Sequence, residues 1–537
     1  MKKTIKIIDL PSKQIGRKKN KNGTTYIYYR YNFLRENGKT TFDETGIGKL
    51  DESGKKLIPN RNYYDFFPDD SDKYIVSNKS FGLTYVLNKI VKAVRLDKTL
   101  SSIFGNDAYD ILTLAFYILA NGNVVSHAQS WIDESVLPYK ISKLTSQKIS
   151  RLFERIDDEK RLDFFKKWTK QHLAQECWYY DVTSISSYSK KISILEFGYN
   201  RDMDKLPQIN IGMCYGSTTK LPLFYQVYNG SITDKTYFSF LLRDFPLISP
   251  NNRINLVTDQ GFVTQDNLAQ VANEEGQKFG LLCPLPLHWN DAKRILENHT
   301  AFIKQDANYI KDSTTFGCSV TDIVMGQPVK IYIYYNMEKV SYEIVQFYEK
   351  ISRMEEELEE LKKLKYSLLD YKKYNKYFDI KITKESFTYE RKSKAIDEYL
   401  KDCGFLILIS IDCDLTPSEA LCRYRQKDII EKQFYQLKNE IDFKRLKTHN
   451  LQTTEGKLFV GFLALILRSY ILNLLKNDTK QKNFNIPDII KELQKIKVVE
   501  TKSSSKLMVP LTKKQKDILK IFNIKEDDFL KSIFKKK

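Results

Sequence analysis

Four polar residues have side chains and a spacing that could bind and position an anionic group: Tyr424, Lys427, Glu431 and Lys438. They follow one another at intervals of three, four and seven residues, so on a helix they share one arc. One carboxylate then lies among two ammonium groups and a phenol, which could position phosphates on the adjoining face. A surface helix with four ordinary polar residues is the alternative, although a solvated helix spreads its charges more evenly.

One helix, over about residues 416–445, is expected to position this arc. Thr416, Pro417 and Glu419 mark its start, because they supply a capping box and a proline at the first helical position. A core-facing stripe at helical spacing lies beside the polar arc. It comprises Ile430, Phe434, Leu437 and Ile441.

Two aspartates stand on predicted strands that precede this helix. A run of aromatic and β-branched residues contains Asp181, and a short apolar strand at 254–258 ends in Asp259. Two further strands are expected between them, at 208–215 and 221–228. Most aspartates at strand ends form turns or caps, but two of them in this order before the polar helix argue against that role.

The spacing Tyr-(2)-Lys-(3)-Glu-(6)-Lys resembles the Tyr-(2)-Arg-(3)-Glu-(6)-Lys signature of bacterial transposases of the insertion-sequence-four superfamily. Residues 229–234 resemble a Gly-Asn-x-x-Asp turn that recurs in that family. Residues 259–262 resemble its Asp-Arg-Gly-Phe run, with Gln260 in place of Arg. Lys427 stands where the family has Arg, which keeps the positive charge but lacks the planar fork that binds phosphate in a bidentate way.

Transposases of this kind are DDE recombinases, and the resemblance implies that Asp181, Asp259 and Glu431 are the catalytic, metal-binding carboxylates. The expected cofactor is a pair of Mg²⁺ ions, with Mn²⁺ as a substitute, because two such ions can activate the attacking oxygen and stabilise the leaving oxygen. Asp442 is a rival for the third carboxylate, since it projects within the same arc. It lies three turns beyond Glu431, so Glu431 is preferred.

The resemblance also implies which residues contact DNA. Tyr424, Lys427 and Lys438 are expected to hold the DNA strand. Trp289 is expected to stack on a displaced base, as a tryptophan of the inserted domain does in some relatives. A partly buried structural role is the commoner alternative for such a tryptophan.

The implied fold class is α/β, with an RNase H-like mixed-sheet catalytic core. The separation of Asp259 from Glu431 is too long for a simple core, so a large insertion is expected between them. The expected order is a basic β-rich module at 1–75, a helical DNA-binding region at 76–173, the first part of the core at 174–284, an inserted domain with strands and a heptad helical arm at 285–404, the second part of the core with the signature helix at 405–476, and a basic region at 477–537.

Local patterns support this division. Runs at 26–34 and 39–45 read as a hairpin around Asn37-Gly38. A 3-4 repeat of apolar residues from Ile344 to Leu368 predicts a helical arm, which packs on its own domain or forms a dimer contact. Short helices are expected at 486–496 and 512–522, after a serine linker at 503–505.

Composition limits the partners and the compartment. Lys and Arg outnumber Asp and Glu by 87 to 67, a net charge of +20, which indicates a nucleic acid or an anionic membrane surface unless it reflects genome bias. The apolar run 459–475 contains Arg468, which favours a buried helix over a membrane span. The seven cysteines show no paired C-x-x-C spacing, and the five histidines are scattered along the chain. Neither a disulfide framework nor a zinc site is therefore indicated. A reduced, cytoplasmic protein is therefore expected, and the transposase resemblance implies a bacterial one at the nucleoid.

Together these features predict a DNA transposase of a bacterial insertion sequence. It would bind the terminal inverted repeats, cleave the element ends by metal-dependent phosphodiester hydrolysis and join them to target DNA. Double-stranded DNA is the expected partner, with a homodimer on DNA and no membrane. The alternatives are an RNase H-like nuclease without strand transfer and a transposase-derived DNA-binding protein.

Overall fold

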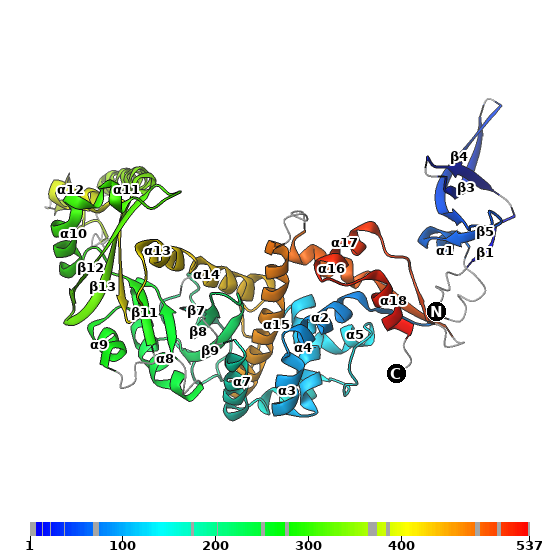
Figure 1. Ribbon diagram of the computed structural model, residues 1–537, viewed down its shortest axis with the longest axis horizontal. Coiled ribbons are helices and arrows are strands. Elements are labelled where there is room, and N and C mark those ends of the chain that lie inside the picture. The colour runs from blue at the N-terminus through cyan, green and yellow to red at the C-terminus, as the bar shows by residue number, and fades with distance from the viewer. Residues whose placement is uncertain are drawn as a thin grey trace. The chain divides into compact units, whose positions relative to one another are not determined.

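The computed structural model divides the chain into two compact units, and each is described by itself (Figure 1). The first comprises Met1–Asp157 and Gln452–Lys537, and the second comprises Asp158–Leu451. The three acidic residues expected at the site all belong to the second unit. The structure describes residues 7–12, 14–21, 23–36, 38–67, 75–172, 177–200, 202–248, 253–273, 279–363, 373–382, 387–477, 484–501 and 506–534.

The second unit is built on a mixed sheet of eight strands, in the order β12-β13-β16-β11-β10-β7-β8-β9. β10 is parallel to β7 and to β11, and every other pair of neighbours is antiparallel. The strands are β7 (Cys177–Ser186), β8 (Gln208–Gly216), β9 (Pro222–Asn229), β10 (Ile254–Val257), β11 (Phe279–Pro284), β12 (Thr315–Val324), β13 (Gln327–Asn336) and β16 (Phe405–Ile411). The α/β class and the four strands expected between residues 177 and 258 are confirmed; the RNase H-like assignment stays a prediction.

Central strands of this sheet are buried along their whole length, as in a sheet that is covered on both faces. All ten residues of β7 and all nine of β8 are buried. Trp168 in α7 is buried and donates from its indole nitrogen to the carbonyl of Pro222 in β9, at 3.0 Å. The helices here are α7 (Asp158–Lys170), α8 (Asp234–Ile248), α9 (Gln265–Asn273) and α10 (Asn290–Ile303), with short 3₁₀ turns at Gln260–Phe262 and Asp306–Asn308.

The region between β11 and β16 contributes to two cores. Its strands β12 and β13 extend the main sheet, because β13 pairs with β16 and β12 pairs with β13, although the sequence suggested a separate inserted domain. Helix α11 (Met337–Lys363), the hairpin β14 (Phe378–Ile382) and β15 (Phe387–Arg391), and α12 (Ser393–Asp402) enclose a second, smaller core. The heptad arm therefore packs on its own region, through Phe347, Ile351 and Leu358; Leu368 lies outside the described residues.

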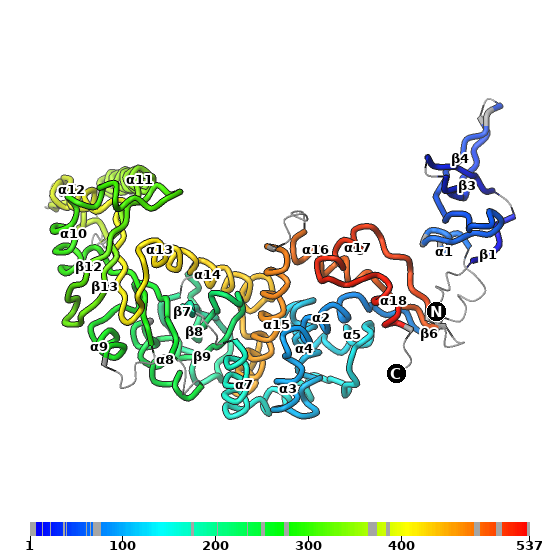
Figure 2. Tube along the Cα trace, in the orientation of Figure 1, coloured from blue at the N-terminus to red at the C-terminus, as the bar shows by residue number. Residues whose placement is uncertain are grey.

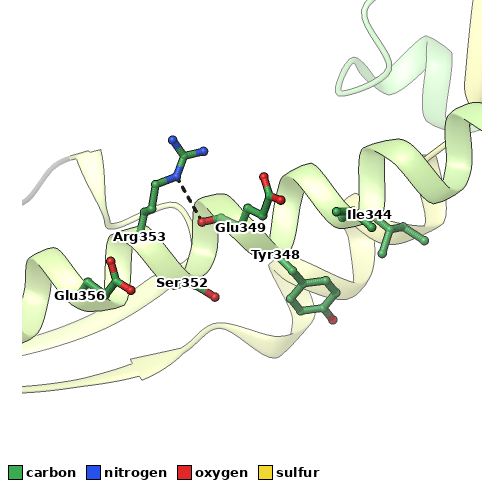
Figure 3. A pocket seen from close by; sticks show the side chains of 7 residues that line it. Ile344, Tyr348, Glu349, Ser352, Arg353 and Glu356 are labelled. Carbon is green, nitrogen blue, oxygen red and sulfur yellow. Dashed lines mark hydrogen bonds between the residues drawn. The ribbon is translucent and has the colours of Figure 1, made fainter.

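The outward face of α11 carries a shallow hollow (Figure 3). Ile344, Val345, Tyr348, Ser352 and Glu356 line it together with Glu349 and Arg353. The Arg353 side chain bonds back to the carbonyl oxygen of Glu349 at 3.3 Å, so it stays on its own helix. The hollow is lined by none of the expected site residues.

The expected single helix at 416–445 is wrong, because the segment is divided in two places. It forms α13 (Pro417–Arg425), α14 (Asp428–Tyr435) and a π-helical turn at Gln436–Glu440. At the first break, Lys427 N–H donates to Tyr424 and Ile430 N–H donates to Lys427, three residues apart instead of four. The capping box of Thr416 and Glu419 is confirmed, and the stripe Ile430, Phe434, Leu437 and Ile441 is buried as expected.

The N-terminal part of the first unit is a β-rich module, as expected. Its five strands lie in the order β1-β5-β4-β3-β2 and enclose Ile27, Ile47 and Leu57. Gly38 has a φ of 74° in the turn between β3 and β4, and Asn37 lies outside the described residues. The elements are β1 (Ile8–Asp9), β2 (Ile15–Lys19), β3 (Thr25–Glu36), β4 (Lys39–Leu50), β5 (Lys56–Pro59) and α1 (Arg61–Phe66).

The rest of the first unit joins the helical block to the C-terminal region. Strands β6, β17 and β18 form one sheet, in which Val498 pairs with Lys79. The elements are β6 (Ile75–Ser80), α2 (Gly82–Ala93), α3 (Leu96–Phe104), α4 (Asp107–Asn121), a 3₁₀ turn (Val125–His127), α5 (Ala128–Asp133), α6 (Ser146–Glu154), α15 (Leu451–Asn477), α16 (Ile486–Gln494), β17 (Lys497–Thr501), β18 (Lys506–Met508), α17 (Lys513–Ile521) and α18 (Glu526–Phe534) (Figure 2). Both expected C-terminal helices are confirmed, whereas residues 503–505 lie outside the described part.

Helix α15 is long and apolar enough to cross a membrane, and within the described residues only the sharply bent pair of α4 with 125–133 also passes that test. In the structure, 72% of its apolar window is buried inside the protein. Arg468 in this helix is 3% exposed, and burial lowers its pKa to about 10. All seven cysteines carry free thiols.

The packing of α15 generates a stability prediction. A Cβ on Gly456 would lie 2.3 Å from the carbonyl oxygen of Phe153 and 2.6 Å from its Cα. Alanine is favoured over glycine in a helix by about 1 kcal/mol, but this overlap should reverse the sign. Gly456→Ala should therefore lower the free energy of unfolding by about 1–3 kcal/mol in denaturant titrations.

Gln452→Ala is the matched control, since Gln452 is exposed on the same helix. It should be neutral or slightly stabilising. A stabilised Gly456→Ala variant would contradict the close contact between α15 and Phe153.

Candidate active site

Asp181 and Asp259 meet because their strands are parallel neighbours. Val257, the last residue of β10, pairs with Tyr179 in β7. Continuing this register by two residues brings Asp259 level with Asp181. Asp181 is 1% exposed, while the Asp259 side chain is 36% exposed at the turn that follows β10.

Backbone amides hold one oxygen of each aspartate. Val182 N–H donates to Asp181 Oδ1 at 2.8 Å. Gln260 N–H donates to Asp259 Oδ1 at 2.9 Å, which caps the 3₁₀ turn after β10. These bonds fix where the carboxylates point.

Two side-chain hydrogen bonds attach residues 416–445, the signature segment, to the sheet. The hydroxyl of Tyr179 donates to Gln426 Oε1 at 3.0 Å, at the break between α13 and α14. Gln433 Nε2, on α14, donates to the hydroxyl of Tyr215 at 3.2 Å. Tyr179 and Tyr215 are themselves paired across β7 and β8. The first turn of α14 is therefore held close to Asp181.

Lys427 reaches from this break into the group of acidic residues. Its Nζ lies 3.3 Å from Asp259 Oδ2 and 3.4 Å from Glu431 Oε1. Its side chain is only 6% exposed, while that of Glu431 is 56% exposed. Three acidic residues from three separate segments thus act on one buried ammonium group.

The Lys427 side chain is protonated at neutral pH. Burial alone lowers the pKa of Lys427, but the negative charges of Asp181, Asp259 and Glu431 outweigh burial, so its pKa is raised above the ordinary 10.5. Lys427 was expected to face DNA beside the metal site. In the structure its ammonium faces the carboxylates, and the DNA contact stays a prediction.

Tyr424 lies beside the same charges. Burial first, and then the charges of Asp259 and Glu431, raise the pKa of its phenol. The hydroxyl is therefore protonated at neutral pH and can donate a hydrogen bond. The structure thus groups Tyr424, Lys427 and Glu431 with the two aspartates, as the sequence suggested.

Lys438 and Asp442 lie apart from this cluster. Lys438, in the π-helical turn, is 7% exposed and pairs with Asp202 Oδ2 at 2.9 Å. Asp442 follows that turn with a φ of 64° and pairs with Lys447 at 2.5 Å. Asp442 is therefore not the third member of the acidic cluster, which keeps Glu431 in that place.

Trp289 also lies outside the acidic cluster. It is half-buried at the N-terminal end of α10, and its ring contacts that of His288 edge-on, with centroids 6.3 Å apart. Whether it stacks on a base stays a prediction.

Several residues of the site had no signal of their own in the sequence. Asp202 and Asp204 belong to the connection after β7, and Asp204 pairs with Arg445 at 2.8 Å. No periodicity marks a loop aspartate. Gln426 and Gln433 are seven residues apart, so their helical spacing could have placed them on one face.

The acidic residues suit a hard cation. Within the described part of the chain, no three carboxylate, imidazole or thiol groups are placed closely enough to hold a metal ion. The ammonium of Lys427 stands instead among Asp181, Asp259 and Glu431, so the surroundings already favour positive charge. Carboxylate oxygens are the ligands that Mg²⁺ prefers. The donor set is therefore of the right kind for such an ion.

Lys427→Met should destabilise the protein, because it leaves acidic residues without their buried counter-charge. Breaking a fully buried pair costs about 3–5 kcal/mol. Asp259 and Glu431 are partly exposed, so we expect a smaller loss, on the order of 2 kcal/mol, in the free energy of unfolding measured without divalent ions. Because the pKa of Lys427 is raised, the stabilisation is complete below 10.5 and is lost only as the pH rises through the folded value. The loss should therefore not change between neutral and mildly alkaline pH.

The matched control is Lys432→Met, at an exposed position of the same helix. It should leave stability within about 0.5 kcal/mol. Equal effects of the two substitutions would show that the lysine–carboxylate pairs contribute nothing specific.

Comparison with known proteins adds little to this geometry. No protein-family model matches the chain, and no curated protein matches it. Among solved structures, the chain is similar to a cryo-electron microscopy structure of a piggyBac transposase synaptic complex with hairpin DNA. The two share 12% sequence identity over 76% of this chain and 77% of that chain, with a TM-score of 0.35. A similarity this slight supports no assignment of fold or function.

Proposed function

We propose that this protein is a DDE-type DNA transposase of a bacterial insertion sequence. It binds the terminal inverted repeats, cleaves the ends of the element and joins them to target DNA. It acts on double-stranded DNA as a homodimer, at the nucleoid in the cytoplasm. Asp181, Asp259 and Glu431 are its catalytic carboxylates.

The observation that carries this proposal is the grouping of three acidic residues around Lys427. They come from the middle of β7, from the end of β10 and from the first turn of α14. Positions 181, 259 and 431 are far apart in sequence, and Asp181 is almost fully buried. Burying a carboxylate is costly unless it is paired, so the burial of Asp181 near the Lys427 ammonium supports a use for negative charge at that point.

The order of elements supports the same proposal. A strand with Asp181 is followed by two antiparallel strands, a helix, and a parallel strand after which Asp259 follows directly in the turn. The segment with Glu431 follows the last strand of the sheet. This is the order expected for an RNase H-like core, in which the carboxylates converge at one edge of the sheet.

Asp181, Asp259 and Glu431 would hold Mg²⁺, which, when bound, supplies activation of the attacking oxygen and stabilisation of the leaving oxygen in phosphodiester hydrolysis. The other side chains act on charge and position. The Lys427 ammonium reduces the repulsion among the carboxylates. The protonated Tyr424 hydroxyl can donate to a phosphate oxygen.

Lys438 would bind a DNA phosphate instead of acting on the carboxylates. Its ammonium is buried against Asp202 at 2.9 Å, so a DNA phosphate would have to compete with that aspartate. A charge-assisted hydrogen bond to phosphate can replace one to carboxylate at similar strength. The pairing would keep Lys438 in place until DNA arrives.

The direct test is cleavage of a plasmid that carries the DNA flanking the coding region. Asp181→Asn, Asp259→Asn and Glu431→Gln should each abolish Mg²⁺-dependent cleavage while leaving DNA binding within about twofold. Since even partners of metal ligands are worth about 10–100-fold, removing a ligand itself should cost more than 100-fold in rate. Gel analysis of cut ends and a filter-binding assay give the two readouts.

Asp442→Asn is the matched control, because Asp442 lies on the same segment but pairs with Lys447. It should cleave at a rate close to that of the parent. Cleavage without joining would favour the nuclease, and binding without cleavage by the parent would favour a DNA-binding protein. Full activity of Glu431→Gln would refute the proposed site.

The net charge of +20 generates a second expectation. Each phosphate that a lysine or arginine neutralises releases counterions, so the logarithm of affinity should fall linearly with the logarithm of salt concentration. The slope should be about −0.9 per neutralised phosphate of duplex DNA. A flat salt response of DNA binding would contradict a phosphate-binding surface.

A further inference from the structure

The connection between β7 and β8, residues 187–207, exposes an unusual amount of apolar surface. Among the described residues it contains the four most exposed large apolar side chains: Tyr188 (74%), Phe197 (73%), Tyr199 (86%) and Met203 (91%). Single exposed apolar residues are normal on a protein surface, but a concentration of them marks a binding site. Three of the four are aromatic.

Hydrogen bonds hold this connection against the sheet. Glu196 and Gln208 exchange two backbone bonds of 3.1 and 2.9 Å, as in a short antiparallel bridge. Asn200 Nδ2 donates to Ser186 Oγ at 3.0 Å, and Gln208 Nε2 donates to the carbonyl of Tyr199 at 2.9 Å. The exposed rings therefore project from a backbone that is fixed at the end of β7.

Two ion pairs tie the same connection to the signature segment. Asp202 pairs with Lys438 at 2.9 Å, and Asp204 pairs with Arg445 at 2.8 Å. The guanidinium of Arg445 also lies over the ring of Tyr188, 5.7 Å from its centroid. The exposed rings are thus connected on one side to the strand that carries Asp181 and on the other to the segment that carries Glu431.

The distance along β7 is compatible with one continuous DNA contact. Ser186, where the connection begins, is five residues beyond Asp181, about 16 Å along an extended strand. A nucleic-acid strand covers that length with about five nucleotides. A strand bound at the carboxylates can therefore reach the exposed rings.

The charge around the rings identifies the kind of partner. The same connection carries the exposed lysines Lys190, Lys191 and Lys205, and exposed Lys444 precedes Arg445, whose guanidinium lies over the Tyr188 ring. The acidic residues Asp202 and Asp204 are already paired within the protein. Aromatic rings interleaved with free cations are the pattern of a surface that binds single-stranded nucleic acid.

We propose that Tyr188, Phe197 and Tyr199 form a stacking surface for unpaired bases of the DNA that is cut at the carboxylates. The proposal rests on the proposed function, since it assumes that DNA is the substrate. Stacking on an aromatic ring does not depend on base identity, so this surface would bind a strand that has left its duplex, whatever its sequence. The neighbouring lysines would hold its phosphates.

The test uses two labelled DNA probes, in the presence of a chelator so that no cleavage occurs. One is a blunt duplex, and the other is the same duplex with a short single-stranded overhang. The full-length parent should bind the overhang probe more tightly. The variant Tyr188→Ala/Phe197→Ala/Tyr199→Ala should lose that preference, with affinity for the overhang probe falling by roughly tenfold or more and affinity for the blunt duplex nearly unchanged.

Two controls separate stacking from other effects. Tyr188→Phe/Tyr199→Phe keeps the rings and should keep the preference. Tyr342→Ala removes a ring that is 68% exposed on α11 and should also keep it. A thermal melt of each variant verifies that it is folded.

The proposal is overturned if the triple variant binds the overhang probe as the parent does, or if the parent has no preference for the overhang. It is also overturned if light scattering shows that the triple substitution dissociates an oligomer while the overhang preference persists, because the rings would then contact another protein chain. Failure of the proposed function is distinguishable, since it would appear as a parent that does not cleave DNA with Mg²⁺ present. Loss of stacking would leave Mg²⁺-dependent cleavage of the blunt duplex measurable.

Discussion

The site depends on one electrostatic constraint, which is that three carboxylates must remain near one another in a partly buried place. Carboxylates that act on the same buried point repel one another more strongly where water is excluded. Lys427 offsets this repulsion, because its buried ammonium lies 3.3 Å from Asp259 and 3.4 Å from Glu431 and also senses the charge of Asp181. The tightened turn at 424–430 joins α13 and α14, and Lys427 is buried at this turn beside the acidic residues.

The sheet and the signature segment together position the polar side chains of the site. The parallel register of β7 and β10 sets the two aspartates level with each other. Hydrogen bonds from Tyr179 to Gln426 and from Gln433 to Tyr215 then hold the helix break against those strands. Because buried polar groups are costly to leave unpaired, each bond also specifies the register of the helix. The position of the polar groups is thus determined by the core beneath them.

Much of this arrangement could be predicted from local patterns, and the rest could not. Strand-forming runs placed Asp181 and Asp259 correctly, and the apolar stripe from Ile430 to Ile441 is buried as its spacing indicated. The spacing of residues, however, predicts only the angle of each side chain around a continuous helix. It does not reveal that the helix is broken between α13 and α14. It placed Lys427 on the polar arc beside the buried stripe, whereas in the structure its side chain is only 6% exposed. The pairing of β17 with β6 joins Val498 to Lys79, and no local signal can report a contact between residues so far apart in sequence.

Two other basic residues of the signature segment are paired with carboxylates in the same way as Lys427. Lys438 and Arg445 are each held by an aspartate of the β7–β8 connection, Asp202 and Asp204, as Lys427 is held by the carboxylates of the cluster. Hydrogen bonding to Arg445 holds the pKa of Asp204 below its usual range, so that pair persists at neutral pH. An anionic ligand that binds this segment must therefore exchange one set of charge pairs for another, which makes the net gain smaller than the sum of its new contacts. Such exchange favours a ligand that replaces several carboxylates at once, as the regularly spaced phosphates of a nucleic-acid strand can.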